Sequence, residues 1–301
     1  MFSRWKNTAV HLAIALAAVA APTVTTTAAH AAPTACPDLH VVVIPGTWET
    51  SKSDPGKGML AMVADDLPGD TRTDYVAYSA TAFPWEGEVY GRSKHEAIAG
   101  ARALIADTAQ RCGATRYALL GYSQGADAAG DLAAEIGTGL GVVPPHRVAL
   151  VGLVADPRRS PTDNLIGPAV PGAGAGGPRL GGFGLLGPRT YTFCAIGDLY
   201  CSTPAGDFAA RIAGFFAQIS NPDPAQFGNY QQQASVLLND VLAAGGLGLL
   251  HDQLNGAAYE ERKKQIDDFI KSGIHQSYPS YQVGGGTTPL TWLRRQLMNL
   301  A

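Results

Sequence analysis

The pentapeptide "GYSQG", residues 121 to 125, is the first place where this chain could carry out chemistry. In a G-x-S-x-G pattern the serine occupies a tight turn between a strand and a helix, and the glycines let these elements pass closely. An apolar strand pattern, residues 116 to 123, leads into Ser123, and an alanine-rich helical pattern, residues 124 to 137, follows it. This context indicates a nucleophilic Ser123 that faces the positive end of a helix.

A serine hydroxyl needs a base that takes its proton and an acid that orients the base. In α/β-hydrolases the chain order is serine, acid, histidine. His146 precedes the strand pattern at 147 to 156, so it would come before any acid that follows that strand. His251 has helical surroundings, whereas His275 follows a helix-ending glycine and enters a turn-rich stretch. Because loops on a rigid scaffold usually carry catalytic groups, we predict His275 as the base and keep His251 as the alternative.

Asp156 and Asp198 both lie at the ends of predicted strands and compete for the role of the acid. Asp156 lies in "VADPRRS", where Asp-Pro and two arginines indicate a turn with a local ion pair. Asp198 ends the last predicted strand, inside "CAIGDLYC", residues 194 to 201. A bridge across so short a loop is worth about 2.5 kcal/mol, against about 4.5 kcal/mol for one from Cys36 to Cys112. We therefore expect the short bridge to hold Asp198 in place, and we predict Asp198 as the acid.

The N-terminus indicates export. Arg4 and Lys6 precede an apolar run, and Ala29-His30-Ala31 has the small-x-small pattern of a cleavage site, which predicts a signal peptide over residues 1 to 31. A retained membrane anchor is the alternative, although the run is shorter than the roughly 20 apolar residues that span a bilayer. The remaining residues, 32 to 301, fit one large domain outside the cytoplasm, secreted or in the cell envelope.

Charge and cysteines narrow the class further. Removal of residues 1 to 31 takes away two of the 22 basic residues and none of the 25 acidic ones, so the remainder is acidic and does not favour nucleic-acid binding. All four cysteines, Cys36, Cys112, Cys194 and Cys201, remain, and an even number in an exported chain indicates disulfides, with three pairings open. The spacing lacks the close pairs of a zinc site, so we expect no metal.

Strand and helix patterns alternate along the chain, which predicts an α/β fold with a largely parallel sheet covered on both faces. A helix is predicted over residues 92 to 111, between the second and third strands. Residues 161 to 190 are too rich in glycine and proline for a regular element and predict a long surface loop. Residues 203 to 274 predict two or three helices. The predicted strands are residues 39 to 46, 73 to 80, 116 to 123, 147 to 156 and 189 to 197.

Several motifs together resemble the cutinase family of serine esterases. They are "GYSQG", Cys112 eleven residues before Ser123, "CAIGDLYC", a tyrosine (Tyr278) three residues after His275, and "GTWE" after the first strand. The resemblance implies a three-layer α/β/α sandwich of the α/β-hydrolase type over residues 32 to 301. It also implies a catalytic triad of Ser123, Asp198 and His275, disulfides Cys36–Cys112 and Cys194–Cys201, and an oxyanion hole formed by the backbone N–H groups of Thr47 and Gln124.

The chain departs from small fungal cutinases between Asp198 and His275, which lie 77 residues apart. The segment 161 to 190 is also long, and both segments should flank the site. This arrangement resembles actinobacterial cutinase-like enzymes, notably the mycobacterial subgroup with phospholipase and thioesterase activity. The resemblance implies hydrolysis of lipid acyl esters or thioesters, with residues 203 to 274 as a candidate lid.

The expected substrate is a lipid or another acyl ester, with peripheral contact to a lipid envelope, no nucleic acid, and a monomeric enzyme. No metal or organic cofactor is implied. Three alternatives stay open on the same scaffold: a polyester or cutin hydrolase, an acyltransferase that uses the same triad, and a catalytically silent envelope-binding protein.

Overall fold

Five parallel strands form a single sheet in a computed structural model that describes residues 35–301. The predicted signal peptide, residues 1 to 31, lies outside the described residues. The strand order is β2-β1-β3-β4-β5, and every neighbouring pair is parallel. The strands are β1 (Leu39–Ile44), β2 (Thr71–Tyr75), β3 (Arg116–Tyr122), β4 (Val148–Val154) and β5 (Thr190–Phe193).

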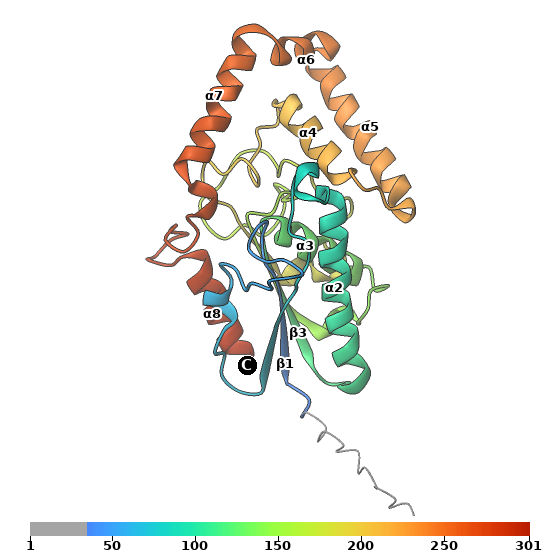
Figure 1. The fold of residues 1–301 in the computed structure, drawn as a ribbon, viewed down its shortest axis with the longest axis vertical. Helices are drawn as coiled ribbons and strands as arrows, with labels where there is room; N and C mark the ends of the chain where they lie inside the picture. The colour runs from blue at the N-terminus through green and yellow to red at the C-terminus, as the bar shows by residue number, and fades with distance from the viewer. Residues whose placement is uncertain (1–34) are drawn as a thin grey trace, which may run out of the picture. The chain divides into compact units, whose positions relative to one another are not determined.

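Helices cover both faces of the sheet (Figure 1). The helices on one face are α2 (Tyr90–Arg111) and α3 (Gln124–Gly137), and those on the other are α1 (Ala61–Ala64) and α8 (Pro289–Leu300). Every residue of β1 is buried, because apolar side chains point to both helical layers. The predicted three-layer α/β/α sandwich is therefore confirmed.

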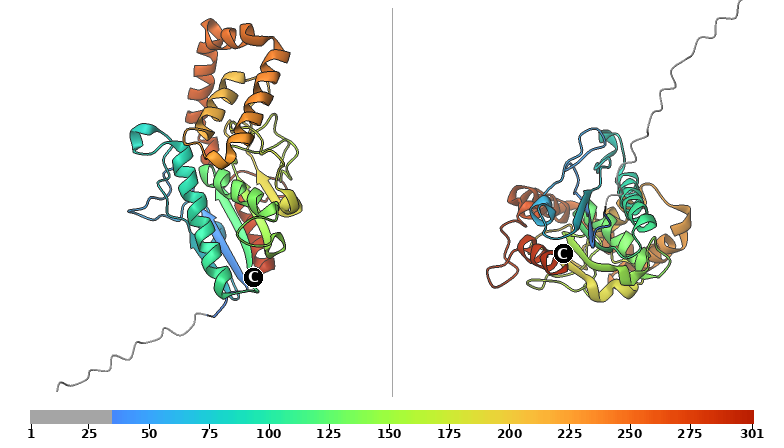
Figure 2. Two further views of the ribbon diagram at one scale, coloured as in Figure 1. Left: turned by 90° about the vertical axis from the view of Figure 1, so that its right-hand side faces the viewer. Right: turned by 90° about the horizontal axis from the view of Figure 1, so that it is seen from below.

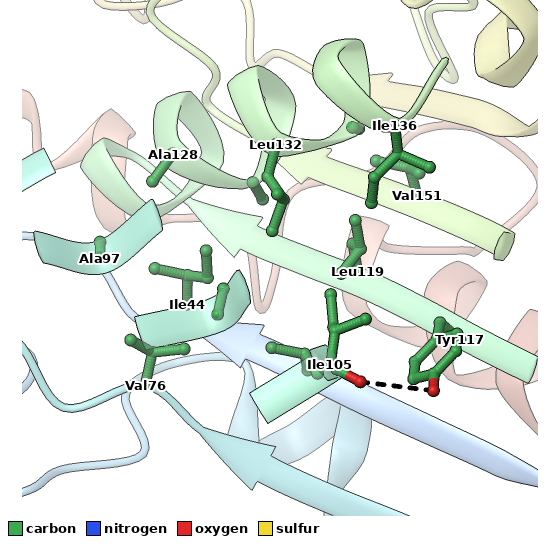
Figure 3. Close-up of a cluster of buried hydrophobic side chains, with 14 of the residues drawn as sticks. Ile44, Val76, Ala97, Ile105, Tyr117, Leu119, Ala128, Leu132, Ile136 and Val151 are labelled. Atoms are coloured by element: carbon green, nitrogen blue, oxygen red, sulfur yellow. Dashed lines mark hydrogen bonds between the residues drawn. The ribbon is translucent and has the colours of Figure 1, made fainter. Parts of the chain in front are cut away.

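The layer formed by α2 and α3 is a continuous apolar cluster, shown in Figure 3. Ile105 of α2 and Leu132 of α3 lie against Leu119 of β3 and are fully buried. Burial of each such side chain contributes about 1.5–3 kcal/mol relative to exposure. The cluster gives a rigid base to the loops that leave the carboxyl ends of the strands, where the candidate site lies.

All five strands end earlier than the sequence predicts, and β2 and β5 differ most. β2 ends at Tyr75; the amide of Val76 still donates to Val43 O at 2.9 Å, and the chain then turns away through Ala80, whose φ is 51°. β5 ends at Phe193, because a turn closes when Asp198 N donates to Ala195 O at 3.0 Å. Asp198 therefore lies in a turn beyond the strand. Apolar pattern alone continued both strands too far.

Residues 203–274 contain four α-helices rather than the predicted two or three, and they lie beyond the carboxyl ends of the strands (Figures 1 and 2). Residues 161–190 are irregular, as predicted, apart from a short 3₁₀ helix, Gly184–Arg189. Helix α8 has no counterpart among the predicted elements, although Thr288 and Pro289 form an N-terminal capping signal at its start. The four helices are α4 (Phe208–Gln218), α5 (Phe227–Ala244), α6 (Gly246–Leu254) and α7 (Gly256–Ser272).

Candidate active site

Ser123 lies at the sharp turn between β3 and α3. Its φ and ψ are 54° and −121°, a conformation that a side-chain-bearing residue adopts only under strain. The turn depends on the flanking glycines: a Cβ on Gly121 would lie 2.2 Å from Gly125 O, and one on Gly125 would lie 2.1 Å from Ile44 O. The predicted tight turn from strand to helix is present, and only glycine allows these close backbone contacts.

His275 lies beside Ser123, although 152 residues separate them in the chain. Its Nε2 is 2.8 Å from Ser123 Oγ, and its Nδ1 is 2.9 Å from Asp198 Oδ2. The ring stacks on that of Tyr122, whose hydroxyl also donates to His275 O at 2.7 Å. Tyr200 packs against the ring from another side, with centroids 4.5 Å apart. The imidazole is thus held in place by aromatic packing and by both of its ring nitrogens.

Asp198 is fully buried, and its carboxylate has three hydrogen-bond donors. Oδ2 accepts from His275 Nδ1 at 2.9 Å and from the Tyr278 hydroxyl at 2.6 Å, and Oδ1 accepts from Tyr200 N at 3.0 Å. Burial and the nearby Asp198 charge raise the pKa of the Tyr278 hydroxyl well above its ordinary value, so this hydroxyl stays protonated and donates. The contact from Tyr278 to Asp198 was not predicted; the only sequence signal was the spacing of three residues from His275.

Both disulfides that the resemblance implies are confirmed. Cys194 and Cys201 are bonded across the Asp198 turn with a Cα–Cα distance of 5.8 Å, and Cys36 is bonded to Cys112. Just past the bridge, Ser202 N donates to Asp198 O at 2.9 Å. The bridge, the turn and the tyrosine contact therefore act on the same few residues around the carboxylate.

The alternative acid and base lie elsewhere. Asp156 accepts from the Arg179 guanidinium, with Nη1 at 2.6 Å from Oδ2, and does not contact a histidine. Burial raises the pKa of Asp156 despite this arginine. His251 lies on α6 with its side chain exposed, next to Asp252. His146 lies in the turn before β4. Of the weighed candidates, the structure brings together Ser123, Asp198 and His275.

The two candidate oxyanion residues lie in the turns that follow β1 and β3. Gln124 is the first residue of α3, where backbone N–H groups point out of the helix end. Its side chain is held by Thr81 O, which accepts at 2.9 Å, and by the Ser93 hydroxyl, which donates at 3.1 Å. Thr47 lies in the turn after β1. In this turn Gly46 packs against the Tyr122 ring so closely that a Cβ on Gly46 would be 2.8 Å from a ring atom. Gln124 directly follows Ser123 in the chain, and Gly46, the residue before Thr47, packs against Tyr122, the residue before Ser123.

A largely apolar cavity of about 410 Å³, open to solvent and lined also by Gln265, Asp268 and Ser272, lies next to the Asp198 turn. Its walls come from the turn, through Ile196 and Leu199, and from the end of α7, through Phe269. The Phe269 ring lies 5.5 Å from that of Tyr200 and 6.4 Å from that of His275, centroid to centroid. Helix α7 therefore extends the site with an apolar wall, in the segment that the sequence analysis marked as an insertion.

A buried ion cluster lies beneath the serine turn and was not predicted as a unit. Arg179, from the glycine-rich loop, bonds Asp156 at 2.6 Å and Asp131 at 2.8 Å, and it fits because Gly130 of α3 has no side chain there. Burial alone would raise the pKa of Asp131, but the surrounding cations outweigh burial and lower it well below its ordinary value. The cluster consists of Lys94, Asp127, Asp131, Asp156, Arg158, Arg179 and, from α4, Gln218.

The same cluster connects α4 to the helical layer formed by α2 and α3. Gln218 Nε2 donates to Asp127 Oδ2 at 2.6 Å, and its Oε1 accepts from Lys94. Asp127 lies in the first turn of α3, four residues after Ser123, and is fully buried. The insertion is thus connected to the helix that supports the serine. No group of three histidine, cysteine or acidic residues in the described part of the chain is arranged to hold a metal ion.

Comparison with known proteins identifies the family of this chain. The Cutinase family model matches residues 35–227, a segment that contains Ser123 and Asp198 and ends before His275. A "Carboxylesterase Culp6 homolog" from Corynebacterium glutamicum is 34% identical over 206 residues, which cover 56% of this chain and 66% of that protein.

Solved structures have lower identity. The catalytic core domain of acetyl xylan esterase from Trichoderma reesei is 23% identical, with 68% of this chain and 98% of that chain covered and a TM-score of 0.47. Lysin B from Mycobacteriophage D29 is 18% identical, with 88% and 98% covered and a TM-score of 0.48. With the family model matched over more than half of its residues, this chain belongs to the cutinase family of carboxylic ester hydrolases.

Proposed function

We propose that this protein is a secreted serine esterase that hydrolyses carboxylic esters or thioesters of lipid acyl chains. The observation that carries the proposal is the continuous hydrogen-bonded row from Ser123 through His275 to Asp198, at 2.8 and 2.9 Å. Such a row lets a base take the serine proton while the buried carboxylate stabilises the imidazolium that forms. The two disulfides fit an oxidising compartment outside the cytoplasm.

The reaction proceeds in two halves. His275 Nε2 takes the Ser123 proton while Oγ attacks the carbonyl carbon, and the protonated His275 then gives the proton to the leaving alcohol or thiol. In the second half His275 takes a proton from water, which attacks the carbonyl carbon of the acyl-enzyme, and His275 then returns the proton to Ser123 as the carboxylic acid leaves. Backbone N–H groups of Gln124 and Thr47 donate to the oxyanion in each tetrahedral intermediate. A lipid acyl chain is supported by the apolar cavity beside the Asp198 turn, whose Phe269 wall adjoins His275.

A fluorophosphonate probe tests the proposal directly. The protein should become labelled at Ser123 and hydrolyse p-nitrophenyl butyrate, and the Ser123→Ala variant should do neither, because the nucleophile is absent. Mass spectrometry of the labelled peptide identifies the residue. A protein that stays unlabelled, or a Ser123→Ala variant that still reacts, excludes the serine-esterase function and favours a silent binding protein.

Tyr278→Phe is expected to lower kcat/KM about tenfold, because a hydrogen bond to a charged carboxylate is lost. Without this donor, more negative charge stays on the Asp198 oxygen that faces His275, so the acidic limb of the pH profile should move to higher pH. The matched control is Tyr281→Phe, whose hydroxyl contacts Ile196 N at 3.2 Å and not the carboxylate. Equal losses in both variants with unshifted profiles would mean that Tyr278 only supports packing.

Replacement of Cys194 and Cys201 by serine should reduce kcat/KM by about tenfold or more, with a modest loss of about 2.5 kcal/mol in the free energy of unfolding. The short loop adds little chain entropy, but it holds the turn that carries Asp198. The Cys36→Ser, Cys112→Ser double variant is the control: its long loop should cost about 4.5 kcal/mol and leave kcat of the folded fraction unchanged. Urea unfolding and steady-state kinetics distinguish the two. The local role is wrong if both pairs lose stability and activity in the same proportion.

A further inference from the structure

Helices α5, α6 and α7 expose most of their apolar side chains. From residue 227 to residue 272, Val241 is the one buried residue. Helices in proteins take most of their stability from an apolar face packed against another surface. Figures 1 and 2 show these helices as an arch beyond α4, with α6 at the end far from the sheet. Large exposed side chains on α5 and α6 are Phe227, Val236, Leu238, Leu242, Leu247 and Leu254.

Residues 224–254, here called the apolar arc, are almost free of charge. They contain no lysine, arginine or glutamate; their charged residues are Asp240, which pairs with Arg211, and Asp252. Helix α7 differs sharply, because charged side chains recur from Glu260 to Lys271. Within the arch, α7 therefore has a charged surface suited to water, whereas the apolar arc lacks the charges that keep a protein surface soluble.

The composition of the arc favours lipid over protein as the surface that covers it. Protein interfaces are enriched in arginine and have a polar rim, whereas the arc has no arginine; its aromatic residues are Phe227 and Tyr230, and it consists largely of leucine, alanine, glycine and glutamine. No single helix among residues 35–301 is long and apolar enough to cross a membrane. Residues Pro224–Ala244 and Gly246–Leu254 reach that apolar length only together, with a bend of 91° between them. A bent apolar pair suits the boundary layer of a lipid surface, where leucine side chains enter the acyl region.

We infer that the apolar arc docks this enzyme onto a lipid surface with uncharged or zwitterionic headgroups. The inference rests on the proposed function, since a lipid ester substrate supplies such a surface. Because the arc has no basic residues, the anionic-lipid attraction that assists many peripheral proteins is absent, and apolar contact alone holds the arc. Helix α7 follows α6 directly and ends three residues before His275, so the docked arc keeps the active site next to the lipid.

Flotation with phosphatidylcholine vesicles tests the inference, in the Ser123→Ala background so that no lipid is hydrolysed. The protein should float with the vesicles, equally at low and high salt and with or without added phosphatidylserine. The Leu242→Gln, Leu247→Gln variant should partition about tenfold or more weakly, because two exposed apolar side chains are lost. Lys263→Gln, Lys264→Gln on α7 is the matched control and should float like the parent. Circular dichroism checks that each variant is folded.

Three results would overturn the docking surface. The first is a parent protein that does not float. The second is binding that requires anionic lipid or that is lost in the lysine variant. The third is a parent dimer that the leucine substitutions convert to a monomer, because a second copy of the chain would then be the occupant of the arc. With Ser123 intact, all these proteins should hydrolyse p-nitrophenyl butyrate equally. Hydrolysis without flotation refutes lipid docking by the arc but not the esterase function. Flotation without hydrolysis or probe labelling refutes the esterase function but not lipid docking.

Discussion

Asp198→Asn is expected to lower kcat by about four orders of magnitude and to leave the fold intact. The buried carboxylate accepts from His275 Nδ1, and so it keeps Nε2 free to take the Ser123 proton. An amide at this position can instead donate to Nδ1, which places the imidazole proton on Nε2 and removes the base. Steady-state kinetics on p-nitrophenyl butyrate give kcat, and thermal unfolding checks the fold.

Asp156→Asn is the matched control for this result. Asp156 is as deeply buried as Asp198 but contacts Arg179 and not His275. Its substitution should change stability and leave kcat of the folded protein within a few-fold of the parent. If Asp156→Asn abolishes turnover while Asp198→Asn retains it, the assignment of the acid is wrong.

Arg179→Met should destabilise the protein by about 3–5 kcal/mol, because it leaves buried carboxylates without their cation. Arg179 is almost fully buried and bonds Asp156 and Asp131 at 2.6 and 2.8 Å. The variant keeps a long side chain in the space beside Gly130, so the loss reports charge rather than volume. Urea unfolding followed by circular dichroism measures the free energy of unfolding.

Arg102→Met gives the comparison for Arg179. Arg102 pairs with Glu135 between α2 and α3, and both side chains are more than a third exposed. An exposed pair contributes about 0–1 kcal/mol, so this variant should be nearly as stable as the parent. Similar losses in the two arginine variants would contradict a structural role of the buried ion cluster.

The predicted site residues that the structure brings together have local signals in the sequence. Glycines on both sides of Ser123 reflect backbone contacts within one turn, and the cysteines around Asp198 lie in the same loop as the acid. His275 stands just after Gly273, whose left-handed conformation ends α7. Alternating apolar runs likewise predicted the sheet and its two helical layers, because burial on both faces leaves a continuous apolar pattern.

The features that the sequence did not reveal depend on contacts between distant segments. Arg179 lies in a glycine-rich loop that predicts exposure, and its burial becomes evident only when α3 and β4 are in place. Asp127 and Gln218 meet across 91 residues, with no periodicity to connect them. The Tyr278 bond to Asp198 is similar, because a spacing of three residues from His275 does not say which partner the hydroxyl finds.

The segment between Asp198 and His275 is attached firmly at both ends. The disulfide to Cys194 fixes the chain at Cys201, and the bond from the Tyr122 hydroxyl fixes the backbone at His275. Loop-closure entropy grows slowly, with about 0.6 kcal/mol for each doubling of length, so the chain between these points can be long or short at little cost. The length and sequence of residues 203–274 can thus change while the positions of Asp198 and His275 stay fixed, so under the proposed function this segment can vary with the physical form of the substrate.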